Sequence, residues 1–232
     1  MTKEEGGAPR GAFFGRRKGK PLRDRQAELM DVLLPRLRVP RESQIERPED
    51  LFPAPVDDIW LEIGFGGGEH LASQAANHPS TGFIGCEPFI NGMAKLLGRV
   101  EDDALNNIRV HDTDALTLLP LLPENSIGRA FILYPDPWPK RRHRKRRIVS
   151  DESLSMLARI MKPGAVLRFA SDIDDYVAWT LARILRSPDF VWQAEAADDW
   201  RLPWPDWPGT RYEAKALREG RPPSYITAIR KP

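Results

Sequence analysis

The fold of this protein is decided by residues 59–76, which read IWLEIGFGGGEHLASQAA. Residues 59–63, apolar apart from Glu62, predict a short buried strand, and residues 71–76 predict a helix. Between them lies a turn that contains Gly64, Gly66, Gly67 and Gly68. A strand that passes through a glycine-rich turn into a helix is typical of α/β sheets whose ligands bind beyond the carboxyl ends of the strands.

The same alternation of strands and helices continues along the chain. After residues 59–63, further strands are predicted at residues 81–86, 108–110, 129–134, 165–170, 190–194 and 225–229. Helices are predicted at residues 71–76, 90–100, 154–161 and 176–185, the third ending at Lys162-Pro163-Gly164. The pattern predicts an α/β fold with a mostly parallel seven-stranded sheet and helices on both faces.

Length and composition indicate one domain and a reducing compartment. The chain has 232 residues, of which 41% are apolar. We expect a single domain at residues 22–232 and a basic N-terminal arm at residues 1–21 that is disordered without a partner. No apolar run reaches membrane-spanning length, and no signal peptide is visible, so we expect no membrane association. The one cysteine, Cys86, excludes an intrachain disulfide and a Cys/His zinc cage, which favours the cytoplasm and predicts no metal site.

Positive charge is concentrated in two segments, although the net charge is only +2. Residues 1–25 hold eight Lys or Arg against three acids, and residues 140–147 hold seven Lys or Arg and no acid. The rest of the chain is therefore acidic. Two basic patches on an acidic body favour a polyanionic partner such as a nucleic acid. The arm by itself is equally consistent with a solvated tail.

Acidic residues near the glycine-rich turn favour a cationic ligand. The dinucleotide-binding pattern requires a glycine where this chain has Glu69. Glu69 and Glu62 would repel a pyrophosphate, whereas S-adenosylmethionine carries a sulfonium and an ammonium group. Glu87, at the end of the second strand, could accept both hydroxyls of a ribose. Asp114, just after the third strand, could accept from an adenine amino group, although any one of these acids could be a helix cap.

A second informative stretch, residues 131–149, reads FILYPDPWPKRRHRKRRIV. Proline on both sides of Asp136 restricts the backbone and fixes the direction of the carboxylate. That carboxylate could accept paired hydrogen bonds from a guanine. Trp138 could stack on a base or pack against the hydrophobic core as a cap. The basic residues that follow are expected to contact phosphates.

These residues favour methyl transfer to guanine N7. This atom is a lone-pair nucleophile with no proton to remove, so the transfer needs alignment more than a strong base. Asp136 is then expected to hold the guanine and to stabilise the cationic product. Cys86 is expected on the second strand, away from the Asp136 loop, which disfavours chemistry through a cysteine nucleophile.

Residues 135–140, together with His143 and residues 145–149, resemble the bacterial tRNA (guanine-N7-)-methyltransferase family. The resemblance extends over residues 16–230. It implies a Rossmann-like class I methyltransferase fold and transfer of a methyl group from S-adenosylmethionine to the guanine at position 46, in the tRNA variable loop.

The resemblance also implies roles for individual residues. The resemblance implies four cofactor-binding acids, Glu62, Glu87, Asp114 and Asp136. The glycine-rich turn described above adds Gly64 and Gly66 to this set. Asp136 is in addition the implied catalytic residue. The implied substrate-binding residues are Lys140, Asp172, Thr210, Arg211, Tyr212 and Glu213. Without the resemblance, residues 210–213 would be interpreted only as a loop that leads into the last strand.

Two alternatives remain open. The Asp-Pro-Trp sequence loosely resembles the motif of methyltransferases that act on an exocyclic amino group of an RNA or DNA base. A non-catalytic RNA-binding module could also keep such a fold. Beyond tRNA, no obligate protein partner is evident, and we expect a monomer or a homodimer.

Overall fold

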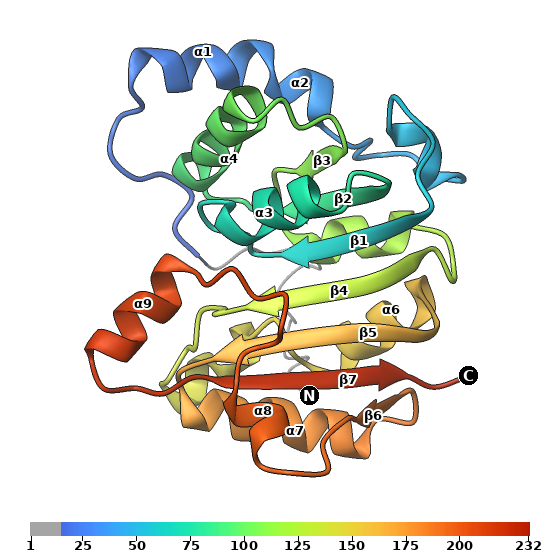
Figure 1. The fold of residues 1–232 in the computed structure, drawn as a ribbon, viewed down its shortest axis with the longest axis vertical. Helices are drawn as coiled ribbons and strands as arrows, with labels where there is room; N and C mark the ends of the chain where they lie inside the picture. Colours follow the sequence, from blue (N-terminus) through green and yellow to red (C-terminus); the bar gives the residue numbers. More distant parts are fainter. Residues whose placement is uncertain (1–14) are drawn as a thin grey trace, which may run out of the picture.

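A seven-stranded sheet forms the centre of the molecule, with its strands in the order β3-β2-β1-β4-β5-β7-β6 (Figure 1). The computed structural model describes residues 15–232. The strands are β1 (Asp58–Ile63), β2 (Thr81–Cys86), β3 (Ile108–His111), β4 (Ile127–Leu133), β5 (Met161–Ser171), β6 (Phe190–Trp192) and β7 (Ser224–Arg230). β1 to β5 pair in parallel, and β7 is antiparallel to both β5 and β6. The predicted α/β fold is confirmed.

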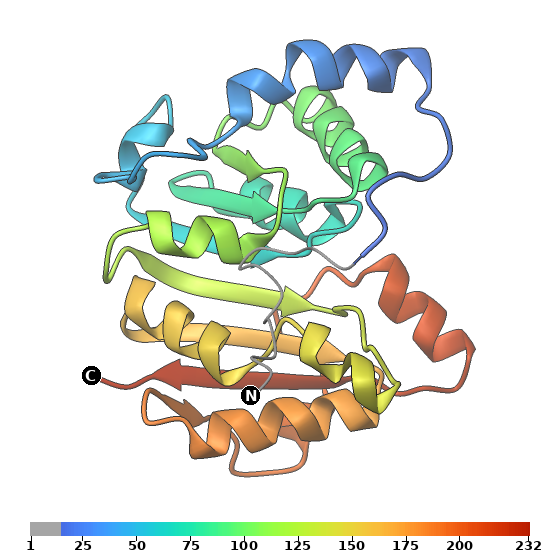
Figure 2. The same ribbon diagram turned by 180° about the vertical axis from the view of Figure 1, so that it is seen from behind.

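Helices cover both faces of this sheet, as Figures 1 and 2 show from opposite sides. The helices are α1 (Asp24–Val32), α2 (Leu34–Leu37), α3 (Glu69–Asn77), α4 (Ile90–Asp102), α5 (Ala115–Leu118), α6 (Asp151–Ile160), α7 (Asp174–Arg186), α8 (Asp198–Arg201) and α9 (Arg211–Arg218). One buried cluster joins the sheet to α5, α6 and α7, and a second joins it to α1, α3 and α4. In the described residues no helix combines the length and the apolarity that a membrane crossing requires.

The sequence of β1 explains its central position. Leu61 belongs to one buried cluster, and its neighbour Trp60 belongs to the other. Successive side chains of a strand point to opposite faces, so a strand covered on both faces is apolar on both. This is why residues 59–63 are apolar apart from Glu62, whose buried carboxylate has a partner in His70.

The tryptophan- and proline-rich loop at residues 202–208, which follows α8, covers part of one sheet face. Trp204 is buried, and its Nε1 donates to Thr227 Oγ1 of β7 at 2.9 Å. Asp206 accepts from Arg168 of β5 at 2.7 Å and forms an ion pair with Arg129 of β4. The loop therefore replaces a helix over β4, β5 and β7.

Several boundaries differ from the predicted ones. Lys162-Pro163-Gly164 does not follow the end of a helix as a terminator, because α6 ends at Ile160 and β5 begins at Met161. The pairing of β4 with β5 is irregular at this point, and Gly164 has φ of +79°. Proline is tolerated in a strand at such a bulge, because its missing N–H is not needed there.

The expected loop at residues 210–213 is instead the start of α9. Thr210 is the N-cap, and its Oγ1 accepts from the backbone N–H of Glu213 at 3.1 Å. A Thr-x-x-Glu sequence is a known helix-start signal, so the sequence did contain the information.

The basic N-terminal arm was predicted to span residues 1–21, of which 1–14 lie outside the described residues. Residues further along the arm contact the start of α4. The carbonyl of Arg17 accepts from the N–H of Ile90 at 3.0 Å, and Asn91 bonds to the backbone of Gly19 and of Lys20.

Candidate active site

A cavity of about 430 Å³ lies at the carboxyl ends of β1, β2 and β4. Its walls include Gly64 and Gly66 after β1, Glu87 after β2, Asp114 after β3 and Asp136 after β4. β1 lies between β2 and β4, which is where the strand order changes direction. Ligands of open α/β sheets bind at such a point. The fold thus brings five of the predicted cofactor residues to one cavity.

The glycine-rich turn provides an open backbone surface in this cavity. Gly64, Gly66 and Gly68 all have positive φ, a conformation that other residues rarely adopt. A Cβ added to Gly64 would meet no atom within 4 Å, so the backbone there faces open space. A Cβ on Gly66 would lie 3.0 Å from the ring of Tyr212. The turn can therefore receive a ligand, with the start of α9 over it.

Glu87 is buried at the end of β2, and its two oxygens are fixed in place. Oε2 accepts from the N–H of Gly66 at 2.7 Å, and Oε1 accepts from the N–H of Phe89 at 2.9 Å. Burial, with a smaller contribution from the nearby charge of Asp136, raises the pKa of Glu87 to about 7 despite these two bonds. A carboxylate oxygen can accept more than one hydrogen bond, so Glu87 can still receive ligand hydroxyls.

Asp114 and Cys86 line the same cavity. Asp114 is the N-cap of α5, and its Oδ1 accepts from the N–H of Leu116 at 3.0 Å, leaving Oδ2 for a ligand. Cys86 was expected away from the Asp136 loop, and both residues border this cavity. Burial raises the pKa of the Cys86 thiol, which keeps it protonated and a poor nucleophile.

Asp136 lies in a strained loop and faces the cavity. Tyr134 and Trp138, on either side of it, have φ of +49° and +41°, unusual values for residues with side chains. Within residues 15–232 the Asp136 carboxylate makes no hydrogen bond or ion pair. Loss of hydration in the loop raises its pKa. An unpaired carboxylate with a perturbed pKa in a cavity is typical of a functional site.

Trp138 lines the cavity and belongs to neither buried cluster of the core. The guanidinium of Arg146 lies 4.9 Å from its ring centroid, and the His143 ring lies edge-on at 6.0 Å. Of the two roles that the sequence left open, this position favours a stacking surface.

The basic run at residues 140–147 does not present all its charges to solvent, so the expected phosphate contacts do not extend to Arg147. The Arg147 side chain is fully buried and forms an ion pair with Asp175 of α7. Arg144 also pairs with Asp175, at 2.6 Å. Lys140, Arg141, Arg142 and Lys145 remain exposed.

Comparison with known proteins gives the family. A family model described as a putative methyltransferase matches residues 57–224. A protein of Agrobacterium fabrum (strain C58), named tRNA (guanine-N(7)-)-methyltransferase, is 56% identical over 100% of both chains. A protein of Rhizobium meliloti (strain 1021) with the same name is 55% identical over 97% of this chain and 98% of its own. This chain belongs to the tRNA (guanine-N7-)-methyltransferase family.

Solved structures support the fold of this family member. The 16S rRNA (adenine(1408)-N(1))-methyltransferase from Catenulisporales acidiphilia superposes with a TM-score of 0.53 at 15% identity, covering 84% of this chain and 98% of that one. At this identity the likeness bears on the fold alone.

One predicted cofactor residue of this tRNA (guanine-N7-)-methyltransferase family member lies outside the cavity wall. Glu62 is buried beneath the glycine-rich turn, and its Oε2 lies 2.7 Å from His70 Nδ1 of α3. The pair joins the end of β1 to the helix after the turn. In the described part of the chain, no three His, Cys, Asp or Glu side chains are grouped so as to hold a metal ion.

The predicted substrate residues of this family member divide into two groups. Tyr212 lines the cavity, and Arg211 lies beside it, with Nη2 3.1 Å from the Tyr212 hydroxyl. Lys140 is the exposed first residue of the basic run. Asp172 is bound in an ion pair with Arg221 at 2.7 Å.

Glu213 and Thr210, from the same predicted set, hold α9 in place. Thr210 caps the helix, and Glu213 is buried. Glu213 accepts from Trp207 Nε1 at 2.8 Å and from the hydroxyl of Tyr225 in β7. The sequence did not indicate that Tyr134, which also lines the cavity, would belong to the site, because its position depends on the turn after β4.

Proposed function

We propose that this methyltransferase transfers a methyl group from S-adenosylmethionine to N7 of guanine at position 46, in the variable loop of tRNA. The observation that carries the proposal is the set of three carboxylates, Glu87, Asp114 and Asp136, around a cavity that opens on a glycine-rich turn. Three acids favour a cationic ligand over a dinucleotide. The names of the relatives at 55–56% identity supply the substrate class.

The residues of the cavity fit S-adenosylmethionine. Gly64 leaves backbone space for the amino-acid part, Glu87 can accept from the ribose hydroxyls, and Asp114 can accept from the adenine amino group. When bound, the cofactor supplies an electrophilic methyl group next to a positive sulfur. Glu62 does not reach the cavity wall and supports the turn through His70.

Asp136 acts on the guanine. Its carboxylate accepts from the N1–H and the exocyclic amino group, which turns N7 toward the cofactor side of the cavity. No proton has to leave N7, so orientation supplies most of the acceleration. The negative charge of Asp136 also stabilises the positive charge that develops on the methylated base. Trp138 supports the base by stacking, and the exposed cations of the basic run, with those of the arm, contact tRNA phosphates in the cytoplasm.

Labelled S-adenosylmethionine and unmodified tRNA test this function directly. We expect the label in 7-methylguanosine at position 46, and we expect borohydride and aniline to cleave the tRNA at that nucleotide. Label in a nucleoside that resists this cleavage would favour transfer to an exocyclic amino group. Binding of tRNA with no transfer of label would favour the non-catalytic module.

The affinity for S-adenosylmethionine should increase as the pH rises through about 7. The ribose hydroxyls donate to the ionised form of Glu87, whose pKa in the free protein is about 7. Below that pH the ligand must displace a proton, so the dissociation constant should rise up to about tenfold for each pH unit of acidification. Calorimetric titrations between pH 6 and 8 measure this dependence.

The control for this pH dependence is Glu87→Gln, which has no titrating carboxyl at this position. It should bind more weakly, with a flatter profile. The same slope in both proteins would assign the dependence to another group, such as the ligand amine.

The stability of the ligand-free protein should show the opposite trend with pH. Its native state holds the Glu87 proton more tightly than the unfolded chain does, so this group lowers stability as pH rises from about 4.5 to about 7.

A further inference from the structure

Arg147 is the last residue of the basic run, but its contacts are internal. Nε donates to the carbonyl of Pro137 at 2.8 Å, and Nη2 donates to the carboxylate of Asp175. Its guanidinium carbon lies 4.6 Å from the ring centroid of Tyr176 and 5.0 Å from that of Trp179. The side chain has no exposed area. Arg147 thus connects the loop after β4 to helix α7.

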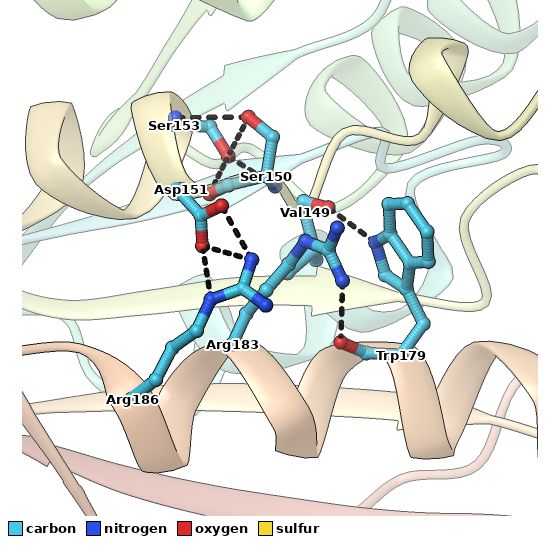
Figure 3. Close-up of polar contacts among 7 residues, drawn as sticks. All are labelled: Val149, Ser150, Asp151, Ser153, Trp179, Arg183 and Arg186. Atoms are coloured by element: carbon cyan, nitrogen blue, oxygen red, sulfur yellow. Dashed lines mark hydrogen bonds and ion pairs between the residues drawn. The ribbon is translucent and has the colours of Figure 1, made fainter.

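The same face of α7 holds the residues that follow Arg147. Figure 3 shows Trp179 Nε1 donating to the carbonyl of Val149, at 2.8 Å, and Arg186 bound to Asp151 at the start of α6. Arg183 lies over the Trp179 ring, 3.2 Å from its centroid, and donates to the Trp179 carbonyl. The chain from residue 147 to residue 151 is therefore attached to α7 by several bonds.

The Asp136 loop requires such external support. Pro135, Pro137 and Pro139 have no N–H, so three of its backbone positions cannot donate hydrogen bonds. Two further residues, Tyr134 and Trp138, have positive φ, a conformation that persists only when the surroundings impose it. The bond from Arg147 to the carbonyl of Pro137, the residue next to Asp136, supplies a constraint that the loop itself cannot supply.

We propose that Arg147 is a positioning residue, which fixes the direction of the Asp136 carboxylate by tying Pro137 to Asp175 on α7. The sequence had suggested that this arginine contacts tRNA phosphates. Its guanidinium instead binds two parts of the protein: Nε donates to the loop after β4, and Nη2 donates to helix α7. The inference rests on the proposed methyl transfer, because the rate of that reaction is what the position of Asp136 controls.

Two variants test the proposal, Arg147→Lys and Asp175→Asn. Lysine keeps the charge but cannot reach the Pro137 carbonyl and Asp175 together in the planar geometry of a guanidinium. Asp175→Asn, at an exposed position of α7, removes the negative charge but keeps an oxygen that can accept from Arg147, so we expect the fold to remain while the attachment weakens. We expect each variant to lower the single-turnover rate at saturating cofactor and tRNA about 10- to 100-fold, with an unchanged dissociation constant for S-adenosylmethionine.

A phosphate contact predicts different results. Lysine would keep such a contact, and the rate of Arg147→Lys would stay near that of the unaltered protein. Asp175→Asn would release Arg147 and Arg144 and would tighten tRNA binding without slowing the reaction. Either result would overturn the proposal. If the melting curve shows that Arg147→Lys does not fold, the rate of Asp175→Asn alone decides between the positioning role and a phosphate contact.

The matched control is Arg25→Lys. Arg25 also joins its guanidinium to carboxylates, those of Glu101 and Asp102, but in an exposed position on α1. The Arg25→Lys variant should transfer methyl groups at the rate of the unaltered protein, because exposed ion pairs contribute little to stability. Absence of methyl transfer by the unaltered protein would contradict the proposed function itself, whereas normal rates in both test variants would contradict the positioning role alone.

Discussion

Asp136→Ala is expected to lower the single-turnover rate of methyl transfer about 10²- to 10³-fold, the usual cost of losing one preorganised polar group at the reacting centre. The carboxylate faces the cavity and makes no hydrogen bond or ion pair with residues 15–232, so it is available to a ligand. Rapid-quench measurements with labelled S-adenosylmethionine and saturating tRNA give this rate. The dissociation constant for the cofactor should change less than the rate, because Glu87 and Asp114 remain.

The matched variant Asp136→Asn separates charge from shape. Asparagine keeps the size and one acceptor, but its amide would point a donor at a base edge that is itself a donor. It should therefore be nearly as slow as the alanine variant. Both variants should melt at the temperature of the unaltered protein, because Asp136 holds no other residue in place. An alanine variant that retains a rate within tenfold of normal would remove Asp136 from the reaction.

Gly92→Ala is expected to damage both the fold and cofactor binding. Gly92 lies in the first turn of α4, and a Cβ there would overlap the carbonyl oxygen of Gly66 and approach Glu87. Backbone cannot move aside as a flexible side chain can, so the glycine-rich turn must shift. Overpacking of this kind costs about 1–3 kcal/mol of stability. We expect a lower melting temperature and at least a tenfold weaker affinity for S-adenosylmethionine by calorimetry.

Gly98→Ala, in the same helix, is the matched control. A Cβ at Gly98 would meet no atom within 4 Å. Because alanine favours a helix more than glycine does, this substitution should raise stability by about 0.5–1 kcal/mol and leave cofactor affinity unchanged. Equal effects of the two substitutions would mean that the close approach of α4 to the turn is unimportant.

The sequence was most informative where a local pattern has one structural meaning. The run at residues 59–63 is apolar apart from Glu62 because β1 is covered on both faces, and this buried strand was predicted correctly. The acids Glu87, Asp114 and Asp136 follow strands whose carboxyl ends meet in a parallel sheet, so their approach to one cavity followed from the predicted topology. The start of α9 was also readable, from Thr210 and Glu213, but was interpreted as a loop.

The sequence was least informative about which charges are used inside the protein. Residues 140–147 form an unbroken basic run, and nothing in the run distinguishes Arg147 from Arg142. The partner of Arg147 is Asp175, which is 28 residues away along the chain and reaches it only when α7 packs beside the loop. In the same way, Cys86 and Asp136 share a cavity because β2 and β4 both flank β1.

The sequence by itself therefore determined the α/β fold, the glycine-rich turn and the acids around it, because strand periodicity and turn composition act over a few residues. Only the tertiary structure decided which candidates face the cavity and which support it. Glu62 pairs with His70, Glu213 holds Trp207 and Tyr225, and Arg147 is buried against α7. The physical reason is that the burial and pairing of a charge depend on elements brought together from distant parts of the chain.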